Sequence, residues 1–235
     1  MSARLARALR REVLRANQLL VESGLVLGTF GNASGADRAA GLMVIKPSGV
    51  PYEELTPGKM VPVSLETGAV LEGALRPSSD TPTHLELYRA FGCGGVAHAH
   101  SEFATALAQV RMPVRCLGTT HADHFRGDVP VTRPLTEAEV AGDYERNTGR
   151  VIVEAFASLG LAPLEVPGVL VASHGPFTWG EDALAAVERA RLLELLARMD
   201  VTARLVAPGA ARPDPYLVAK HYLRKHGKGA YYGQP

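Results

Sequence analysis

The stretch GGVAHAHSEF, residues 94–103, decides how the rest of the chain is interpreted. Val96, His98 and His100 alternate in it with small residues, so in a β-strand they would project from one face. We expect a short strand here, followed by a helix that the hydroxyl of Ser101 caps. Two imidazoles on one face are half of a metal site. The alternative is a pair of hydrogen-bonded, partly buried histidines, and the pair alone leaves both interpretations open.

The whole chain has the composition of an ordinary globular protein. Of its 235 residues, 46% are hydrophobic and 21% are charged, and the formal net charge is +1. This length favours one domain over 1–235, and the charge gives no electrostatic case for nucleic acid or an anionic membrane. Two cysteines in unrelated settings argue against a disulfide framework and fit a reducing cytoplasm. No apolar run reaches the roughly 18 residues of a membrane span.

Hydrophobic periodicity and turn residues predict helices and strands without a regular β-α-β alternation. Helices are expected over 1–20, 80–92, 101–110, 135–160, 181–199 and 215–227, and strands with their turns over 42–49, 61–73, 94–100 and 167–175. In the first helix, one apolar stripe is formed by Leu5, Leu9, Val13, Ala16 and Leu20. Thr136 and Glu139 form a capping-box pattern at the start of the fourth helix. This mixture favours a single three-layer α/β/α domain with a mixed, largely antiparallel central sheet.

A third histidine strengthens the case for a metal. His174 is expected to close a strand just before GPFTWG, where glycines and a proline mark a sharp turn. Three histidines without cysteine favour a catalytic zinc site, because such sites keep one coordination position open. Asp80 is a candidate fourth ligand or base, although an Asp in its position is more often a helix cap. His84 is an alternative ligand.

Three small polar loops suggest an anion-binding site, although each loop taken alone is more often a plain turn. They are TFGNASG at 29–35, KPSG at 46–49 and PSS at 77–79. Such loops offer backbone N–H groups and hydroxyls, and Lys46 adds a positive charge. None of them matches a Walker loop or a dinucleotide fingerprint. A fourth segment, GTTHADHFRGD, contains Asp123. This residue is either a proton carrier or an ordinary acidic residue of a solvated loop.

Together these segments resemble the class II aldolase and epimerase family, and most closely its 4-epimerases of L-ribulose 5-phosphate. The matching stretches are collinear over nearly the whole chain: GNASGADR, VIKPSGV, RPSSDTPTH, GGVAHAHSEFATALAQ, GTTHADHFRGDVPVTRPLT, TGRVIVE, PGVLVASHGPFTWG and KHYLRKHGKGAYYGQ. The tail sequence and Asp80 favour an epimerase, since the similar fuculose-phosphate aldolases carry Glu at the position of Asp80. A phenylalanine at 30 and an alanine at 172 depart from the pattern of many relatives.

The resemblance implies a metal-dependent epimerisation at C4 that interconverts L-ribulose 5-phosphate and D-xylulose 5-phosphate by retro-aldol cleavage, aldehyde rotation and re-addition. It implies one zinc ion per subunit, with other divalent metals possible, held by Asp80, His98, His100 and His174. It implies that the substrate's phosphate and hydroxyls are bound by Gly31, Asn32, Lys46, Ser48, Gly49, Ser78 and Ser79. The implied catalytic proton carriers are Asp123 and Tyr232, on opposite sides of the site, with Glu145 supporting Asp123.

The resemblance also implies a cytoplasmic homotetramer with its sites at subunit interfaces. The tail, 227–235, would carry Tyr232 into the site of a neighbouring subunit. The alternatives are a fuculose-phosphate-type aldolase that releases its aldehyde and a related sugar-phosphate lyase or epimerase. A non-enzymatic, adducin-like module is disfavoured because the chain keeps all four implied ligands. The pathway stays open between arabinose and ascorbate degradation.

Overall fold

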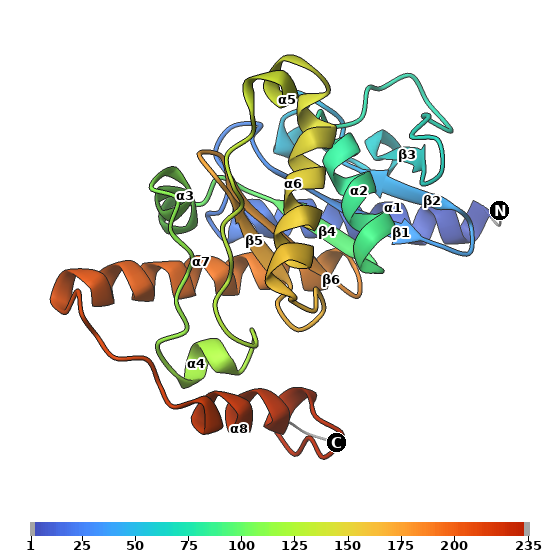
Figure 1. Ribbon diagram of the computed structural model, residues 1–235. Coiled ribbons are helices and arrows are strands. Elements are labelled where there is room, and N and C mark those ends of the chain that lie inside the picture. The colour runs from blue at the N-terminus through green and yellow to red at the C-terminus, as the bar shows by residue number, and fades with distance from the viewer. Residues whose placement is uncertain (1–2, 233–235) are drawn as a thin grey trace.

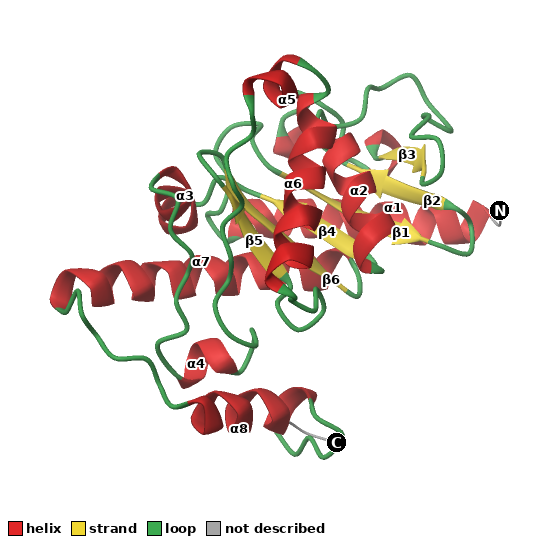
Figure 2. Cartoon of the chain, viewed as in Figure 1, coloured by secondary structure: helices red, strands yellow, loops and turns green. Residues whose placement is uncertain are grey.

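The computed structural model describes residues 3–232, and its centre is a six-stranded sheet between layers of helices (Figures 1 and 2). The strands are β1 (Asn32–Asp37), β2 (Leu42–Ile45), β3 (Val61–Ser64), β4 (Gly95–His98), β5 (Gly168–Val171) and β6 (Gly175–Gly180). Their order in the sheet is β3-β2-β1-β4-β6-β5, and each pair of described neighbours is antiparallel. The predicted α/β class with a largely antiparallel sheet is confirmed.

Two pairs of helices cover the two faces of the sheet. The helices are α1 (Ala3–Glu22), α2 (Thr81–Phe91), α3 (Glu102–Gln109), α4 (Thr119–Ala122), α5 (Glu137–Ala141), α6 (Tyr144–Leu159), α7 (Ala183–Val206) and α8 (Pro215–His226), with 3-10 turns at Tyr52–Glu54 and Pro57–Lys59. Helices α1 and α7 pack on one face, while α2 and α6 pack together on the other. The predicted apolar stripe of α1 is confirmed, because Val13, Ala16 and Leu20 are fully buried.

The glycine pair that precedes the two histidines allows β4 to lie against the start of α7. A Cβ atom on Gly94 would lie 1.9 Å from the carbonyl oxygen of Glu181, and one on Gly95 would lie 2.1 Å from that of Asp182. No side chain fits at either position, because the backbone itself is the obstacle. Strand β4 is also paired on both sides, with β1 and β6. The position of His98 at its end is therefore tightly constrained.

The helix after the histidines is capped by a distant residue. Ser101 occupies the N-cap position of α3, but its side chain makes no cap hydrogen bond within residues 3–232. Instead the backbone N–H groups of Phe103 and Ala104 donate to the Glu194 carboxylate of α7, at 2.9 and 3.0 Å. The predicted hydroxyl cap is wrong, because a carboxylate at a helix N-terminus satisfies two N–H groups and also favours the helix dipole.

Several other elements differ from the predictions. Strand β4 ends at His98 rather than at position 100, and residues 32–35 of the predicted polar loop belong to strand β1. The helix expected over 135–160 is two helices, α5 and α6, separated at Gly142, although the capping box of Thr136 and Glu139 at its start is confirmed. The strand expected to end at His174 ends at Val171, and GPFTWG is strand β6 rather than a turn. His174 lies in the tight turn between β5 and β6. Ser173, the residue before it in this turn, has a left-handed φ of 61°.

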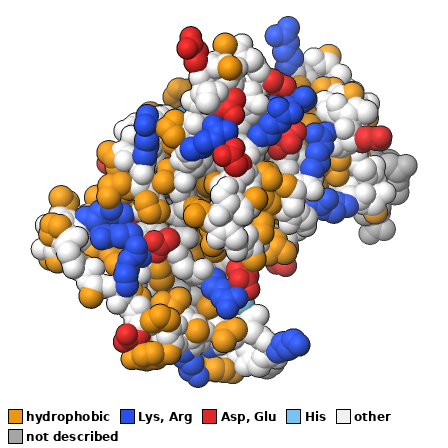
Figure 3. All heavy atoms as spheres, in the orientation of Figure 1, with side chains coloured by type: hydrophobic (Ala, Val, Ile, Leu, Met, Phe, Trp, Pro, Cys, Tyr) orange, Lys and Arg blue, Asp and Glu red, His pale blue; other side chains and the backbone are white. Residues whose placement is uncertain are grey.

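Helix α8 lies apart from the sheet and packs against the short helix α4 (Figure 1). The chain after α8 turns back, so that the N–H groups of Tyr231 and Tyr232 donate to the carbonyl oxygen of Arg224, at 3.0 and 3.2 Å. Apolar side chains gather over this part of the surface (Figure 3), and Tyr216 and Leu223 on α8 are more than half exposed. The last three residues of the predicted tail lie outside the described residues.

In the portion of the chain that the structure describes, the helices are too short or too polar to span a membrane.

Candidate functional site

Three histidines from separate segments converge at one end of the sheet. His98 ends β4, His100 follows it, and His174 comes from the turn between β5 and β6. One ring nitrogen from each lies within 4.8 Å of the others, and the Nε2 atoms of His98 and His100 are 3.1 Å apart. The predicted pair therefore does project to one place, and the predicted third histidine joins it.

The protein orients the ring of His98 so that its Nε2 atom faces the ring of His100. The distance between His98 Nδ1 and the carbonyl oxygen of Pro176 is 2.9 Å. Since only an N–H can bond to a carbonyl, Nδ1 of His98 carries the proton and Nε2 presents a lone pair. The ring of Phe177 stacks on that of His98 at 4.1 Å and fixes its plane. This is the arrangement that prepares a histidine for a metal ion.

Two of these imidazoles, His100 and His174, are buried in surroundings that favour their neutral form. Burial lowers the pKa of His174 to about 3, and the neighbouring rings of His98 and His100 add to the effect. Burial and His98 also lower the pKa of His100. Three imidazoles that converge from separate segments have the donor chemistry of a divalent transition-metal site. The residues present therefore fit a metal ion of this kind.

Asp80 lies at the start of α2 and borders the same cavity as the histidines. It does not act as the helix cap that its position suggests, since its side chain makes no cap bond in the described structure. The side-chain amide of Asn32 donates to its Oδ2 at 2.6 Å. Burial alone would raise the pKa of Asp80, but the nearby His98, His84 and Asn32 outweigh it and lower that pKa. Asp80 is therefore ionised and bonded to Asn32 of β1, and it is not in the group of ligand atoms that lie within 4.8 Å of one another.

His84 lies inside the wall rather than in the cavity. It is fully buried, with Nδ1 2.7 Å from the hydroxyl of Ser34, which in turn lies 2.7 Å from that of Tyr88. It is not among the residues that line the cavity. The alternative of His84 as a ligand therefore has no support from its position.

A cavity of about 390 Å³ opens in front of the histidines. All residues that the resemblance implied for substrate binding line it, together with the four implied metal ligands: Gly31, Asn32, Lys46, Ser48, Gly49, Ser78, Ser79, Asp80, His98, His100 and His174. Two of the three polar loops are joined by backbone hydrogen bonds, because Ser48 N–H donates to the carbonyl of Arg76 and Ser78 N–H to that of Lys46. The remaining loop is joined to them by the side-chain amide of Asn32, which donates to the hydroxyl of Ser78 at 3.1 Å. One cavity thus combines a potential metal site with the predicted anion-binding loops.

Gly31 shows how closely the first of these loops approaches the histidine strand. Its φ is +74°, and a Cβ there would lie 2.6 Å from Cγ1 of Val26 and 2.9 Å from the carbonyl oxygen of His98. A side chain at this position would be strained by its φ and would push the loop away from β4. Glycine is therefore required where the two halves of the cavity meet.

The two predicted proton carriers are not in this cavity. Asp123 follows α4 and accepts two hydrogen bonds from the guanidinium of Arg224 in α8, at 2.9 and 2.6 Å. Burial alone would raise the pKa of Asp123, but Arg224 and His221 outweigh it and lower that pKa. The ring of Tyr232 lies under the same guanidinium, 4.7 Å from its central carbon. Both residues therefore meet at Arg224, whereas the resemblance placed them on opposite sides of one site.

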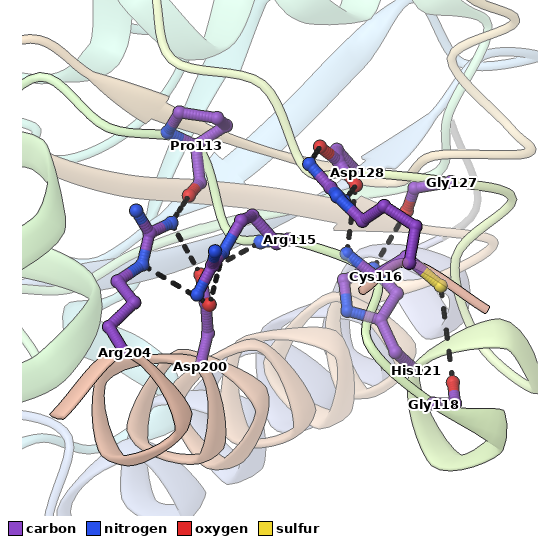
Figure 4. A network of polar contacts seen from close by, with 10 residues as sticks. Pro113, Arg115, Cys116, Gly118, His121, Gly127, Asp128, Asp200 and Arg204 are labelled. Carbon is purple, nitrogen blue, oxygen red and sulfur yellow. Dashed lines mark hydrogen bonds and ion pairs between the residues drawn. The ribbon is translucent and has the colours of Figure 1, made fainter. Parts of the chain in front are cut away.

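A polar network fixes the segment that carries Asp123 (Figure 4). The buried Asp200 of α7 accepts hydrogen bonds from the backbone and side chain of Arg115, at 2.9 and 2.8 Å, and from Arg204. Farther along the segment, the N–H of Cys116 donates to Asp128 at 2.8 Å and His121 Nε2 donates to the carbonyl of Gly127. The position of α4 relative to α7 therefore depends on Asp200.

Replacing Asp200 by Asn is expected to destabilise the protein by about 3 kcal/mol at pH 7, because Arg115 and Arg204 lose a partly buried counter-charge. Burial would raise the pKa of Asp200, but the hydrogen bonds from Arg204 and Arg115 lower it. The carboxylate's contribution is therefore present above the unfolded-state pKa of about 4 and is lost as the pH falls below it. Urea unfolding from pH 7 to pH 3 should show the difference in free energy of unfolding between the parent and Asp200→Asn becoming smaller as the pH falls.

Asp214→Asn provides the control for that measurement, because Asp214 is exposed and its carboxylate accepts only from the hydroxyl of Tyr216 among the described side-chain hydrogen bonds. Its substitution is expected to change the free energy of unfolding by less than about 0.5 kcal/mol. Equal effects of the two substitutions would contradict the role given to Asp200.

Sequence reasoning missed Tyr144 in the cavity and Arg224 outside it, and it gave Glu145 a different neighbour. Tyr144 lines it, with its hydroxyl 3.4 Å from Nδ1 of His174. Glu145 lines it as well and is not beside Asp123, where the resemblance placed it. Both are at the first turn of α6, and the break at Gly142 was the feature that could have indicated an exposed helix start there. Arg224 was one of several basic residues in the last helix, with nothing local to distinguish it.

Comparison with known proteins agrees with this geometry. The family model described as "Class II Aldolase and Adducin N-terminal domain" matches residues 11–201. Two curated proteins named "L-ribulose-5-phosphate 4-epimerase UlaF", from Salmonella paratyphi A and Salmonella typhi, are 52% identical over 227 residues, which cover 96% of this chain and 98% of theirs. A solved L-fuculose 1-phosphate aldolase is 27% identical with a TM-score of 0.75, covering 91% of this chain and 95% of its own. YgbL from Escherichia coli, a putative aldolase/epimerase/decarboxylase, is 25% identical with a TM-score of 0.72, covering 92% and 98%.

Proposed function

This chain belongs to the class II aldolase family, and from that premise we propose that it is an L-ribulose-5-phosphate 4-epimerase. The observation that carries the proposal is identity to two proteins of that name over 96% of the chain. The cavity supports it, since the three histidines and the predicted anion-binding loops line one space. The similar aldolase of known structure has about half that identity, which favours the epimerase over the aldolase.

We infer that the metal is zinc, bound by His98, His100, His174 and Asp80. Histidine and carboxylate ligands without cysteine suit zinc, and they also accept manganese or cobalt. When bound there, the ion supplies Lewis-acid stabilisation of negative charge that develops on the substrate. His98 supports this assignment best, because its Nδ1 proton is held by Pro176 and its Nε2 faces the other two rings.

The reaction that we propose follows from the position of the C4 hydrogen, which is β to the carbonyl and therefore not acidic. Cleavage of the C3–C4 bond avoids its removal, because the C4 hydroxyl gives up a proton while the bonding electrons remain on the enediolate half. The aldehyde half then turns, the C3–C4 bond re-forms on its other face, and a proton is delivered to the new C4 hydroxyl. This sequence needs two proton carriers and a firm hold on the phosphate.

In this proposal the three polar loops and Lys46 bind the phosphate. Lys46 is the only lysine or arginine among the described residues that line the cavity. Ser48 and Ser79 add hydroxyl groups from two of the loops. An anchored phosphate keeps the cleaved aldehyde in the site while its reacting end rotates.

We propose that Asp123 and Tyr232 are the two proton carriers and that both serve the cavity of a neighbouring subunit. They lie beside Arg224 and outside the cavity of their own chain. Helix α8 and α4 form an arm that stands off the sheet, with exposed apolar side chains available for a second copy. A cytoplasmic homotetramer with each site shared between two chains would bring the two halves of the machinery together.

Incubation of the purified protein with L-ribulose 5-phosphate and zinc tests the function directly. We expect D-xylulose 5-phosphate to accumulate until the two pentulose phosphates reach equilibrium. An aldolase would instead release glycolaldehyde phosphate and dihydroxyacetone, the two products of C3–C4 cleavage. Release of these fragments as the main products would overturn the epimerase assignment. If L-ribulose 5-phosphate is not converted with any divalent metal, the substrate assignment is wrong.

A further inference from the structure

The ammonium group of Lys46 is held in the wall of the cavity by unusual contacts. Lys46 is 2% exposed, and Nζ lies 3.4 Å from the carbonyl oxygen of Thr29 and 3.5 Å from that of Pro47. Its third contact is the ring of Tyr52, whose centroid is 4.8 Å from Nζ. None of these contacts is a carboxylate. Burial lowers the pKa of Lys46, and an anion in the cavity would reverse that penalty.

Tyr52 also holds the loop on the other side of the same cavity. Its hydroxyl oxygen lies 2.9 Å from the carbonyl oxygens of both Phe30 and Gly31. The phenol has one proton, so these two acceptors share it. Burial raises the pKa of Tyr52, so the phenol remains a donor at neutral pH. Tyr52 itself is 8% exposed and is not among the residues that line the cavity.

We propose that Tyr52 is the positioning residue of the anion subsite, because its ring places the Lys46 ammonium and its hydroxyl places the Phe30–Gly31 loop. The Tyr52 side chain thereby sets the distance between the Lys46 ammonium and the Phe30–Gly31 loop, which would both contact a bound phosphate. The inference rests on the proposed function to the extent that the anion is the phosphate of a ketose phosphate. It extends that function, since a residue that does not line the cavity controls how tightly the phosphate is held.

The two roles of Tyr52 can be separated by two substitutions. Tyr52→Phe removes the hydrogen bond to the loop and keeps the ring, whereas Tyr52→Leu removes both. We expect Tyr52→Phe to raise KM for L-ribulose 5-phosphate by about threefold, the size of one weak hydrogen bond. We expect KM of Tyr52→Leu to be about tenfold higher than that of Tyr52→Phe, the size of a desolvated cation–π contact. In both variants kcat should change less than KM.

A double-mutant cycle with Lys46→Met shows whether the ring acts through the ammonium. In the Lys46→Met background, the difference between Tyr52→Phe and Tyr52→Leu should vanish, because no cation remains over the ring. The difference between the parent tyrosine and Tyr52→Phe should persist. Zinc content by elemental analysis should be unchanged throughout, since Tyr52 has no contact with the histidines among its described hydrogen bonds. Equal KM values for Tyr52→Phe and Tyr52→Leu, or a difference between them that survives Lys46→Met, would overturn the proposal.

Binding of inorganic phosphate, measured by calorimetry without turnover, distinguishes this inference from the proposed function. The parent should bind phosphate at least about tenfold more tightly than Tyr52→Leu, the same cation–π contribution. If phosphate binding depends on Tyr52 but L-ribulose 5-phosphate is not epimerised, the proposed function fails and the inference stands. If the epimerase is active but phosphate binds equally to both proteins, or to neither, the inference fails and the function stands.

Discussion

Replacing His98 by Asn is expected to remove the metal and to lower turnover by at least about 10³-fold, because the Lewis acid contributes several kcal/mol of charge stabilisation. His98 is the residue to change, since its tautomer is set by Pro176 and its Nε2 is 3.1 Å from that of His100. Asparagine keeps a polar group of similar volume, so the fully paired strand β4 should still form. Elemental analysis measures zinc per chain, and a coupled assay for D-xylulose 5-phosphate measures turnover.

Asp123→Asn is the matched control for metal content, because it should also lose activity while keeping a full complement of zinc. The two variants thereby separate loss of the ion from loss of a proton carrier. A His98→Asn protein that is inactive but still fully loaded with zinc would remove His98 from the ligand set. A variant that keeps both zinc and activity would show that the histidine cluster is not the metal site.

Asp123→Asn is expected to lower the rate of epimerisation by about 10²–10⁴-fold, the usual contribution of a general acid–base group. The structure makes a stronger prediction, because Asp123 and the cavity belong to different parts of one chain. Mixed tetramers of His98→Asn and Asp123→Asn should regain activity, since some sites would join an intact cavity to an intact Asp123. Random mixing of equal amounts should restore about a quarter of the sites.

A second mixture, Asp123→Asn with Tyr232→Phe, serves as the control. Both residues contact Arg224 of their own chain, so every arm in this mixture would lack one of the two groups and no site should recover. Recovery in the second mixture would mean that Asp123 and Tyr232 reach one site from two different chains. Failure of the first mixture, in tetramers verified as mixed by mass spectrometry, would mean that the site is complete within one chain.

Local sequence determined the elements that depend on nearby residues. The alternation of Val96, His98 and His100 predicted a strand with two imidazoles on one face. The strand ends at His98 and His100 follows it, yet their two Nε2 atoms still lie 3.1 Å apart. The apolar stripe of α1 and the capping box of Thr136 and Glu139 were also predicted, because each is formed by residues within a few helical turns. The collinear motif matches along the chain predicted membership of the class II aldolase family, and the comparisons confirm it.

Three features depend on contacts between distant segments and could not be predicted from local sequence: the cap of α3, the place of His174 and the contacts of Tyr52. The cap of α3 comes from Glu194, about 90 positions beyond the N–H groups that it accepts, so no local pattern could replace Ser101 by it. His174 reaches the other histidines because a tight turn between β5 and β6 brings it there, not because a strand ends at it. Tyr52 likewise contacts Gly31 and Lys46 only after the strands between them have paired.

The location of the proton carriers shows the same division. The sequence identified Asp123 and Tyr232 as a candidate pair, but their chain positions say nothing about which cavity they face. The path of α8 away from the sheet, and the bidentate contact of Arg224 with Asp123, place both residues together and outside the cavity of their own chain. Side-chain chemistry is a local property of a residue, whereas its distance from another group depends on how the whole chain packs.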